Sequence, residues 1–221
     1  MTATTQKAYK GMGMEGSVAR WYERNTRKSM AEFRKLAARL REFLPNGGDV
    51  LEVAPGPGFL SIELALAGKF RVTGLDISKT FVELARKNAA EAGVRVDFRE
   101  GNASAMPFAA NSFDLLVCRA AFKNFSEPAK AVKEMHRVLR PGGTGLIVDL
   151  RRDASMTEVS RHVDEMHLSA WNRRITSLIF RFALLKRAYT KREFEEILET
   201  VDFSKSEVRT DDIGMEARFE K

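Results

Sequence analysis

Apolar residues recur at intervals of three and four along the first part of the chain. They stand at Met30, Phe33, Leu36, Ala37, Leu40 and Leu44. This spacing places them on one face of a helix. The pattern predicts a helical segment within residues 2–46, which ends at the Pro-Asn-Gly-Gly stretch of residues 45–48 because proline and glycine do not continue a helix.

Between residues 49 and 150, short apolar runs alternate with segments of helical periodicity. The predicted strands span residues 49–54, 71–76, 94–99, 113–119 and 144–150. The predicted helices span residues 59–67, 80–92 and 127–139. Helical crossovers join parallel strands, so the alternation predicts a mostly parallel sheet with helices on both faces.

The alternation stops after residue 150. Residues 153–187 have helical patterns with no strand between them, and residues 191–200 form a further predicted helix. Residues 206–210 and 215–220 read as two last strands around a short turn, which makes them antiparallel. The prediction is therefore an α/β fold with a seven-stranded sheet that ends in an antiparallel hairpin.

We expect one structural unit with two helical additions. Residues 1–46 would form an N-terminal helical cap, and residues 47–221 the main domain, with an insertion over about 153–190 after the fifth strand. Both additions could cover the ligand-binding edge of the sheet.

Composition and charge limit the cellular locations and partners expected for the protein. The chain has 221 residues, 37 Lys and Arg against 30 Asp and Glu, and a net charge of +7. One cysteine excludes an internal disulfide, the first ten residues lack the apolar core of a signal peptide, and no apolar run reaches the length of a membrane helix. We therefore expect a cytoplasmic protein. The positive charge permits acidic substrates, RNA or an anionic membrane surface without selecting one.

The stretch from Val50 to Gly58 reads as a buried strand followed by a glycine turn, and a second strand ends at Asp76. Gly56 and Gly58 lack a Cβ, so a ligand could approach the backbone there. Asp76 could accept hydrogen bonds from both hydroxyls of a ribose. A nicotinamide-binding turn would have Gly or Ala three residues after Gly58, where Ser61 stands. The pattern predicts a crevice for a different nucleoside.

Four segments resemble, in order and spacing, the signatures of class I S-adenosylmethionine-dependent methyltransferases of the small-molecule, ubiquinone-biosynthesis-like branch. They are residues 51–58, 76–78, 101–114 and 139–143. The resemblance covers about residues 47–150 and implies a Rossmann-like fold, S-adenosyl-L-methionine as cofactor and methyl transfer to a small molecule. The chain departs from the family at Ala54, where Gly is usual, and at Asn102, where Asp is more common.

The resemblance also implies which residues contact the cofactor. Tyr22 would touch its carboxylate end, Asn102 would accept a hydrogen bond from the adenine amino group, and Arg119 would contribute its backbone. The expected cofactor-binding residues are Tyr22, Glu52, Ala54, Gly56, Gly58, Asp76, Ile77, Ser78, Asn102, Ala103 and Arg119.

The implied reaction is an in-line displacement at an activated sulfonium, so alignment and exclusion of water do most of the work. A general base is needed only where the acceptor holds its proton tightly. Tyr22, Asp149 and His167 are the candidates for a catalytic role, although for Asp149 a role as a buried structural acceptor is favoured over that of a base. We predict no metal site, because His162 and His167 are five residues apart and do not share a helix face. Cys118 lies in an apolar strand and is expected in the core.

Candidates for the acceptor pocket come from the N-terminal cap and from the ends of the fourth and fifth strands, because ligands bind at the carboxyl edge of such sheets. They are Met14, Trp21, Phe122, Lys123, Asn124 and Arg151.

Residues 172–192 combine an apolar stripe with dense positive charge. A helix packed on the domain with a solvated basic face, a peripheral contact with an anionic membrane, and RNA binding all fit this pattern. RNA ranks last, because no array of stacking aromatic residues accompanies the charge, so a nucleic-acid partner is not expected. An RNA methyltransferase and a cofactor-binding protein without turnover stay open as alternatives. The acceptor and the oligomeric state also stay open.

Overall fold

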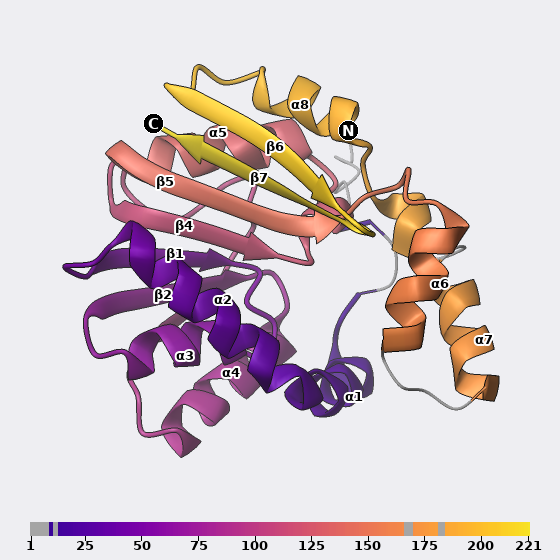
Figure 1. Ribbon diagram of the computed structural model, residues 1–221. Helices are drawn as coiled ribbons and strands as arrows, with labels where there is room; N and C mark the ends of the chain where they lie inside the picture. Colours follow the sequence, from indigo (N-terminus) through magenta and orange to yellow (C-terminus); the bar gives the residue numbers. More distant parts are fainter. Residues whose placement is uncertain (1–8, 11–12, 166–169, 181–183) are drawn as a thin grey trace, which may run out of the picture.

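The computed structural model describes residues 9–10, 13–165, 170–180 and 184–221. Its centre is a seven-stranded sheet in the order β3-β2-β1-β4-β5-β7-β6 (Figure 1). Neighbouring strands from β3 to β5 pair in parallel, and β7 pairs antiparallel with both β5 and β6. The strands are β1 (Gly48–Val53), β2 (Phe70–Asp76), β3 (Asp97–Glu100), β4 (Phe113–Arg119), β5 (Leu139–Leu150), β6 (Lys205–Asp211) and β7 (Gly214–Glu220). The predicted fold class is confirmed.

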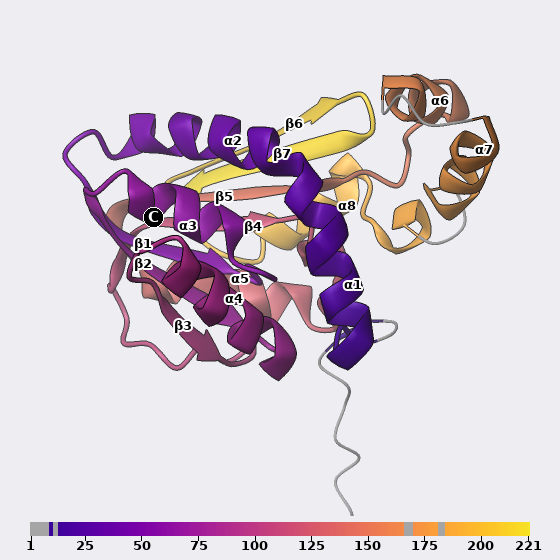
Figure 2. The ribbon, with the colours of Figure 1, turned by 90° about the horizontal axis from the view of Figure 1, so that it is seen from below.

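Helices cover both faces of the sheet (Figures 1 and 2). One layer contains α2 (Met30–Phe43), α3 (Phe59–Leu66) and α4 (Lys79–Glu91), and the other contains α5 (Pro128–Val138) and α8 (Lys191–Leu198). Successive side chains of a strand point to opposite faces, so Val50 packs with the α2–α3 cluster and Leu51 with the α5–α8 cluster. Phe33 and Leu40 of α2 are buried in that first cluster, which makes α2 part of the core.

The N-terminal segment, predicted to be helical, contains two helices. The first helix, α1 (Gly16–Thr26), is separated from α2 by the short 3-10 turn η1 (Arg27–Ser29), and α2 packs on the sheet while α1 lies beside the start of α4 (Figure 2). Two hydrogen bonds attach the start of α1 to that region: the Ser78 hydroxyl donates to the Met14 carbonyl at 2.7 Å, and the Gly16 N–H donates to the Thr80 hydroxyl at 3.0 Å. The predicted cap is thus two elements with different surroundings.

A correction concerns residues 139–143, which precede the fifth strand predicted at residues 144–150. They lie inside β5, where they form a bulge: Phe113 of β4 pairs with Leu139, and Leu115 pairs with Thr144. The glycines at 142 and 143 exchange backbone hydrogen bonds with Lys221, so the chain end holds the bulge in place.

The insertion after β5 is helical, as predicted. It contains α6 (Met156–Glu165), α7 (Ala170–Ile179) and the turn η4 (Leu185–Arg187), at one side of the main body (Figure 1). Val159, Val163, Leu185 and Ile213 form a small core of their own there. Among the described residues, none of the helices combines the length and the apolar character that a membrane span requires.

Candidate active site

A cavity of about 320 Å³ opens at the carboxyl ends of the central strands. After β1 the chain continues to β2 and β3 on one side of the sheet, and it returns to β4 and β5 on the other. The cavity therefore lies at the point where the strand order reverses, the usual ligand position in open α/β sheets. Residues from the ends of β1, β2 and β4 line it, together with an N-terminal group made of Tyr9, Gly13, Met14, Glu15, Tyr22, Thr26 and Phe33.

The two glycines after β1 have different surroundings. Gly56 lines the cavity with φ +55°, and a Cβ added there would meet only the Tyr22 ring, at 3.9 Å. A Cβ on Gly58, with φ +80°, would lie 2.7 Å from the Phe98 ring and 2.9 Å from the Ala85 Cβ. Gly56 thus leaves space for a ligand, whereas Gly58 allows α3 and α4 to pack closely. The expectation that a ligand rests on Gly58 is corrected, because Gly58 is not part of the cavity wall.

Asp76 is buried at the end of β2 and lines the cavity. The N–H of Gly56 donates to one carboxylate oxygen and the N–H of Ser78 to the other, both at 2.9 Å. Burial raises the pKa of Asp76 to about 6, against the opposing effect of these hydrogen bonds. The carboxylate therefore links the turn after β1 to the turn after β2 and presents its oxygens at the cavity.

Glu52, near the end of β1, is also buried in the cavity wall. The Ser61 hydroxyl donates a hydrogen bond to it. Burial raises the pKa of Glu52 to about 7. A carboxyl in this setting can accept a hydrogen bond from a bound ammonium group or hold a proton near neutral pH.

Two alanines of the cavity wall adopt the left-handed conformation that favours glycine. Ala54 and Ala120 follow directly after β1 and β4, and each has φ +57°. Their N–H groups donate to neighbouring strands, Ala54 to the Leu75 carbonyl and Ala120 to the Val148 carbonyl, both at 2.7 Å. The sheet imposes this backbone strain on the edge where a ligand would bind.

Other expected cofactor residues lie along the same wall. Ile77, Ser78, Asn102 and Ala103 all border the cavity, and the side chain of Ile77 is exposed. The Asn102 side-chain oxygen accepts a hydrogen bond from the N–H of Ser104 at 2.9 Å, which fixes the loop after β3.

Arg119, at the end of β4, and Tyr22, in α1, both border the cavity. The Arg119 guanidinium binds Glu32 at 2.7 Å and lies over the Phe33 ring, 4.6 Å from its centre. Tyr22 packs edge-on against Phe81 with 5.7 Å between ring centres. Both side chains are held by aromatic contacts, so they form fixed parts of the wall.

Of the residues predicted for the acceptor pocket, Met14 and Asn124 line the cavity. Trp21 does not, because it lies on the outer side of α1 with 59% of its surface exposed. Phe122 is also outside the wall: it starts the short turn η2 (Phe122–Asn124) and is buried against Phe125 and Phe194. These two expectations are corrected.

Lys123 and Asp149 form a buried ion pair behind the cavity wall. The Lys123 ammonium lies 2.8 Å from Asp149, and the N–H groups of Lys123 and Leu150 donate to the same carboxylate. The ammonium also donates to the carbonyl of Ala120, the strained residue after β4. Neither side chain lines the cavity, so the expected pocket role of Lys123 and the candidate base role of Asp149 are corrected to a structural one.

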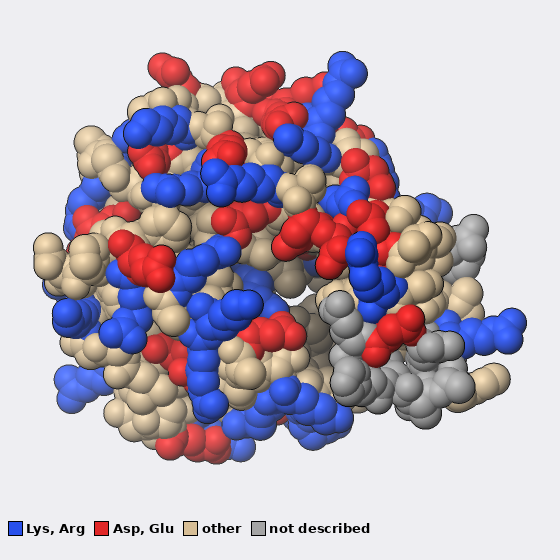
Figure 3. Space-filling view, in the orientation of Figure 1, with Lys and Arg blue, Asp and Glu red and all other residues tan. Residues whose placement is uncertain are grey.

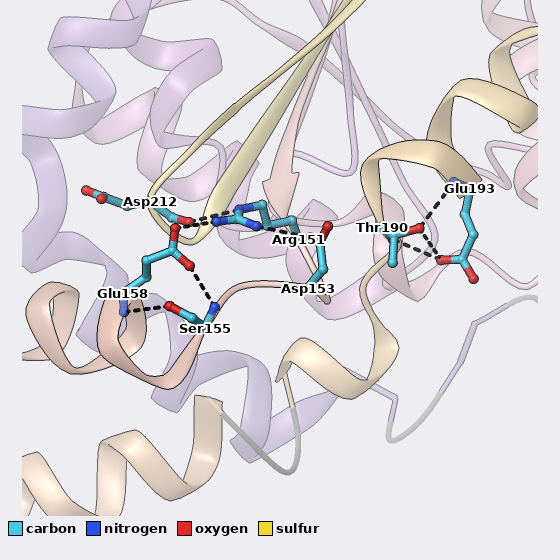
Figure 4. A network of polar contacts seen from close by, with 7 residues as sticks. All are labelled: Arg151, Asp153, Ser155, Glu158, Thr190, Glu193 and Asp212. Carbon is cyan, nitrogen blue, oxygen red and sulfur yellow. Dashed lines mark hydrogen bonds and ion pairs between the residues drawn. The ribbon is translucent and has the colours of Figure 1, made fainter.

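Arg151, after β5, is not part of the cavity wall. Figure 4 shows its guanidinium among Asp212, Asp153 and Glu158. Its guanidinium donates to the Asp212 carbonyl at 2.9 Å and lies 3.3 Å from Asp153, and it also binds Glu158 of α6. Arg151 therefore fastens the insertion to the hairpin turn, which corrects its expected place in the acceptor pocket.

No described residue of the insertion lines the cavity, so the expected cover over the ligand edge comes from α1 and the segment before it. His167 lies outside the described residues. His162 packs edge-on against Phe180, and His136 against Phe203. Cys118 is fully buried, and burial raises the pKa of its thiol well above the usual value, consistent with the expected core position.

Sequence reasoning missed several residues of the wall. The aromatic ones are Tyr9, Phe33, Phe81 and Phe125. Tyr9 forms an isolated antiparallel bridge with Phe125, which brings the start of the chain to the cavity. The only signal was a lone tyrosine in a polar segment, and nothing in the pattern predicts a pairing across more than a hundred residues.

Comparisons with known proteins agree with this geometry. A family model described as a methyltransferase domain matches residues 51–147. The chain is 38% identical to the demethylmenaquinone methyltransferase of Chlorobaculum parvum over 100 residues, which cover 45% of this chain and 40% of that protein. It is 33% identical to the ubiquinone/menaquinone biosynthesis C-methyltransferase UbiE of Roseobacter denitrificans over 150 residues, which cover 65% of this chain and 60% of that protein. The chain thus spans less than two thirds of the length of either relative.

A solved structure matches almost the whole chain. It is a candidate S-adenosyl-L-methionine-dependent methyltransferase from Methanococcus maripaludis, with a TM-score of 0.73, 24% identity, and coverage of 96% of this chain and 95% of that one. At this identity the likeness establishes the fold. Over residues 51–147, the chain is similar to the methyltransferase domain family, and its overall fold is that of the solved structure.

Proposed function

We propose that the cavity binds S-adenosyl-L-methionine and that the protein transfers its methyl group to a small molecule. One observation carries this proposal: the open backbone at Gly56 and the buried carboxylate of Asp76 meet at the strand-order reversal, hydrogen-bonded to each other. The residues fit the cofactor, because a Cβ at Gly56 would occupy cavity space, and a carboxylate suits the hydroxyls of a ribose. When bound, the cofactor supplies an activated methyl group on a sulfonium.

The residues of this chain would bind, orient and exclude water. Asp76 would hold the ribose, Ile77 and Ala103 would flank the adenine, and Glu52 would accept from the amino group of the methionine end. Tyr22, next to Gly56, would close the methionine end. These roles are supported by the position of each residue in the wall. We assign no general base. Of the three predicted candidates, Asp149 does not line the cavity, His167 lies outside the described residues, and Tyr22 is placed at the methionine end.

We further propose an acceptor of the quinone-precursor class, methylated at a ring carbon. The names of the related proteins point to such acceptors. Phe33, Phe81 and Phe125 add aromatic surface to the cavity wall, where a flat ring could stack. The test is methylation of a short-chain demethylmenaquinone analogue, followed by mass spectrometry. A catechol and an alkyl thiol serve as the comparison acceptors, and preferential methylation of either would contradict the quinone class.

Calorimetry with S-adenosylhomocysteine tests the cofactor site. Replacing Asp76 by Asn keeps one oxygen for the N–H of Gly56 but removes the charge, so we expect affinity to fall roughly 10- to 100-fold. Asp97→Asn is the matched control, because the Asp97 side chain is half exposed on β3 and, among the described residues, binds Arg99 alone. Equal affinities of the wild type and Asp76→Asn, or a wild type that binds NAD in place of this ligand, would overturn the assignment.

Two alternatives have less support. An RNA methyltransferase would present a continuous basic surface, whereas Lys and Arg alternate with Asp and Glu on the face shown in Figure 3. RNA retention on the protein at moderate salt would revive this alternative. A protein that binds the cofactor without turnover would release no S-adenosylhomocysteine with any acceptor of the panel.

A further inference from the structure

A second hollow, of about 500 Å³, lies next to the cavity and is rich in positive charge. It is bordered by the start of α8, the turn η4 and the segment at Lys10. We call it the basic hollow; its charged lining residues are Lys10, Arg152, Lys186, Arg187, Glu193 and Glu196.

The two carboxylates of the basic hollow already have partners. Glu193 binds Arg152 and also accepts from the N–H of Thr190 at 2.9 Å, where it closes the cap of α8 (Figure 4). Glu196 accepts from the Arg192 guanidinium at 2.9 Å. These acids therefore leave the remaining cations of the hollow without a counter-charge.

Those cations are Lys10, Lys186 and Arg187. The Lys10 ammonium donates to the neutral Tyr189 hydroxyl at 2.7 Å. For Lys186 and Arg187, no ion pair or hydrogen bond is formed with any described residue. Three positive charges thus face one hollow, and a bound anion would lower their mutual repulsion.

Two consecutive residues, Tyr9 and Lys10, border the cavity and the basic hollow respectively. Tyr9 pairs with Phe125, and the N–H of Lys10 donates to the Asn124 carbonyl at 2.7 Å. These contacts hold Tyr9 and Lys10 between the two hollows.

The electrostatics agree with this closeness. Burial raises the pKa of Tyr9, and the charge of Arg187 opposes that rise. Arg187 therefore acts across the wall on a residue of the cavity, at a range where it could also act on a bound acceptor.

We propose that the basic hollow binds an anionic oxygen group, a phosphate or a carboxylate, carried by the acceptor whose reacting part occupies the cavity. This inference rests on the proposed function. The anionic group would extend past Tyr9 to the cations at positions 10, 186 and 187. Both phosphate and carboxylate accept the charge-assisted hydrogen bonds that ammonium and guanidinium groups donate.

Inorganic pyrophosphate is the probe for this site. We expect the wild type to bind it in calorimetry and the double variant Lys186→Gln/Arg187→Gln to bind it roughly tenfold or more weakly, because two charge-assisted contacts are lost. Lys205→Gln/Arg209→Gln is the matched control: it removes the same charge from exposed positions on the outer strand β6 and should bind like the wild type.

Separate readouts distinguish the two proposals. The wild type and both double variants should bind S-adenosylhomocysteine with equal affinity. If none of the three proteins binds it, the result counts against the proposed function and not against the anion site. The anion site would be overturned if the wild type does not bind pyrophosphate, or if both double variants lose the same amount of pyrophosphate affinity.

The anionic group could belong to a dissolved molecule or to a lipid headgroup. Sedimentation with phosphatidylcholine vesicles, with and without phosphatidylglycerol, separates these sources. Retention that needs both phosphatidylglycerol and the cations at 186 and 187 would assign the site to a headgroup. Pyrophosphate binding without such retention would assign it to a dissolved acceptor.

Discussion

In the turn after β1, two glycines of one motif have different structural roles. Gly56 and Gly58 both have positive φ, but one faces the cavity and the other faces Phe98 and Ala85. Ala54, two residues before, has the same kind of backbone conformation with a methyl group attached. The side chain that each position tolerates depends on what lies opposite it.

Substituting alanine at the two glycines should separate stability from binding. Gly58→Ala should destabilise the fold by about 2–4 kcal/mol, because its methyl group would overlap the Phe98 ring in a backbone conformation that already disfavours a Cβ. Gly56→Ala should cost about 1 kcal/mol and weaken S-adenosylhomocysteine binding instead. Urea unfolding and calorimetry on both variants measure the two effects, and an equal loss of stability in both would contradict this division.

Replacing Ala54 by glycine should stabilise the protein. The left-handed conformation at φ +57° costs a residue with a Cβ about 1–2 kcal/mol, and part of this gain is lost to the greater freedom of glycine when unfolded. We expect a net gain of about 0.5–1 kcal/mol in the free energy of unfolding. Thermal unfolding at fixed pH measures it. A lower melting temperature would mean that the Ala54 methyl group contributes packing that outweighs the strain.

At the scale of elements, a buried ion pair helps to tie the loop after β4 to the end of β5. Lys123 and Asp149 come from η2 and β5, and their hydrogen bonds include the carbonyl of Ala120 in the cavity wall. A sequence shows only a charged residue after each strand. The sheet brings the two together, because β4 and β5 are neighbours with the same direction.

Breaking this pair should cost more than neutralising it. Lys123→Met leaves the Asp149 carboxylate buried without its cation and should destabilise the protein by about 3–5 kcal/mol. Adding Asp149→Asn removes the buried charge, while its amide oxygen can still accept from the backbone N–H of residue 123. The double variant should therefore recover at least about 1 kcal/mol in the free energy of unfolding. Urea unfolding of the single and double variants is the measurement. A double variant less stable than the single one would contradict the account.

At the scale of the whole molecule, the predicted division between cap and main domain stays a prediction, and the packing favours one unit. Phe33, Ala37 and Leu40 of α2 share a core cluster with residues of α3 and the central strands. We therefore expect a single cooperative unfolding transition for this body, and we expect removal of residues 1–46 to prevent folding. Circular dichroism of the full and shortened chains measures both, and a folded shortened chain would show that the cap is dispensable.

Buried carboxyl groups should make stability fall as the pH rises through neutrality. The pKa of Glu52 is about 7 in the folded protein, against an ordinary value of 4.5. The folded state therefore holds this proton more tightly than the unfolded state, and stability is lost as the pH increases from about 4.5 to 7, by about 1.4 kcal/mol for each pH unit between the two values. Glu52→Gln keeps an acceptor for Ser61 and removes this loss.

The measurement is the free energy of unfolding of wild type and Glu52→Gln at pH 5 and pH 8. The wild type should lose more stability than the variant over this interval. Asp76, whose pKa is raised to about 6, contributes a loss of the same sign in both proteins. Parallel losses in the two proteins would contradict the burial of a protonated Glu52.

The sequence alone determined the helices and strands and many of the residues that line the candidate cofactor cavity. The sequence pattern located all seven strands. The central strands β1 and β4 were the clearest, because burial on both faces of a parallel sheet demands continuous apolar runs. The order strand, glycine turn, helix, strand and acid brought Gly56 and Asp76 together, since a short right-handed crossover leaves little other choice.

Only the tertiary structure decided which side chains after β4 and β5 face the cavity and which face the core. Phe122 and Lys123 are buried behind the wall, Trp21 points outward, and Arg151 holds the insertion. It also brought Tyr9 against Phe125 and left the insertion away from the cavity. These outcomes depend on contacts between segments far apart in the chain, and in irregular segments no periodicity records which side of the backbone will meet a partner.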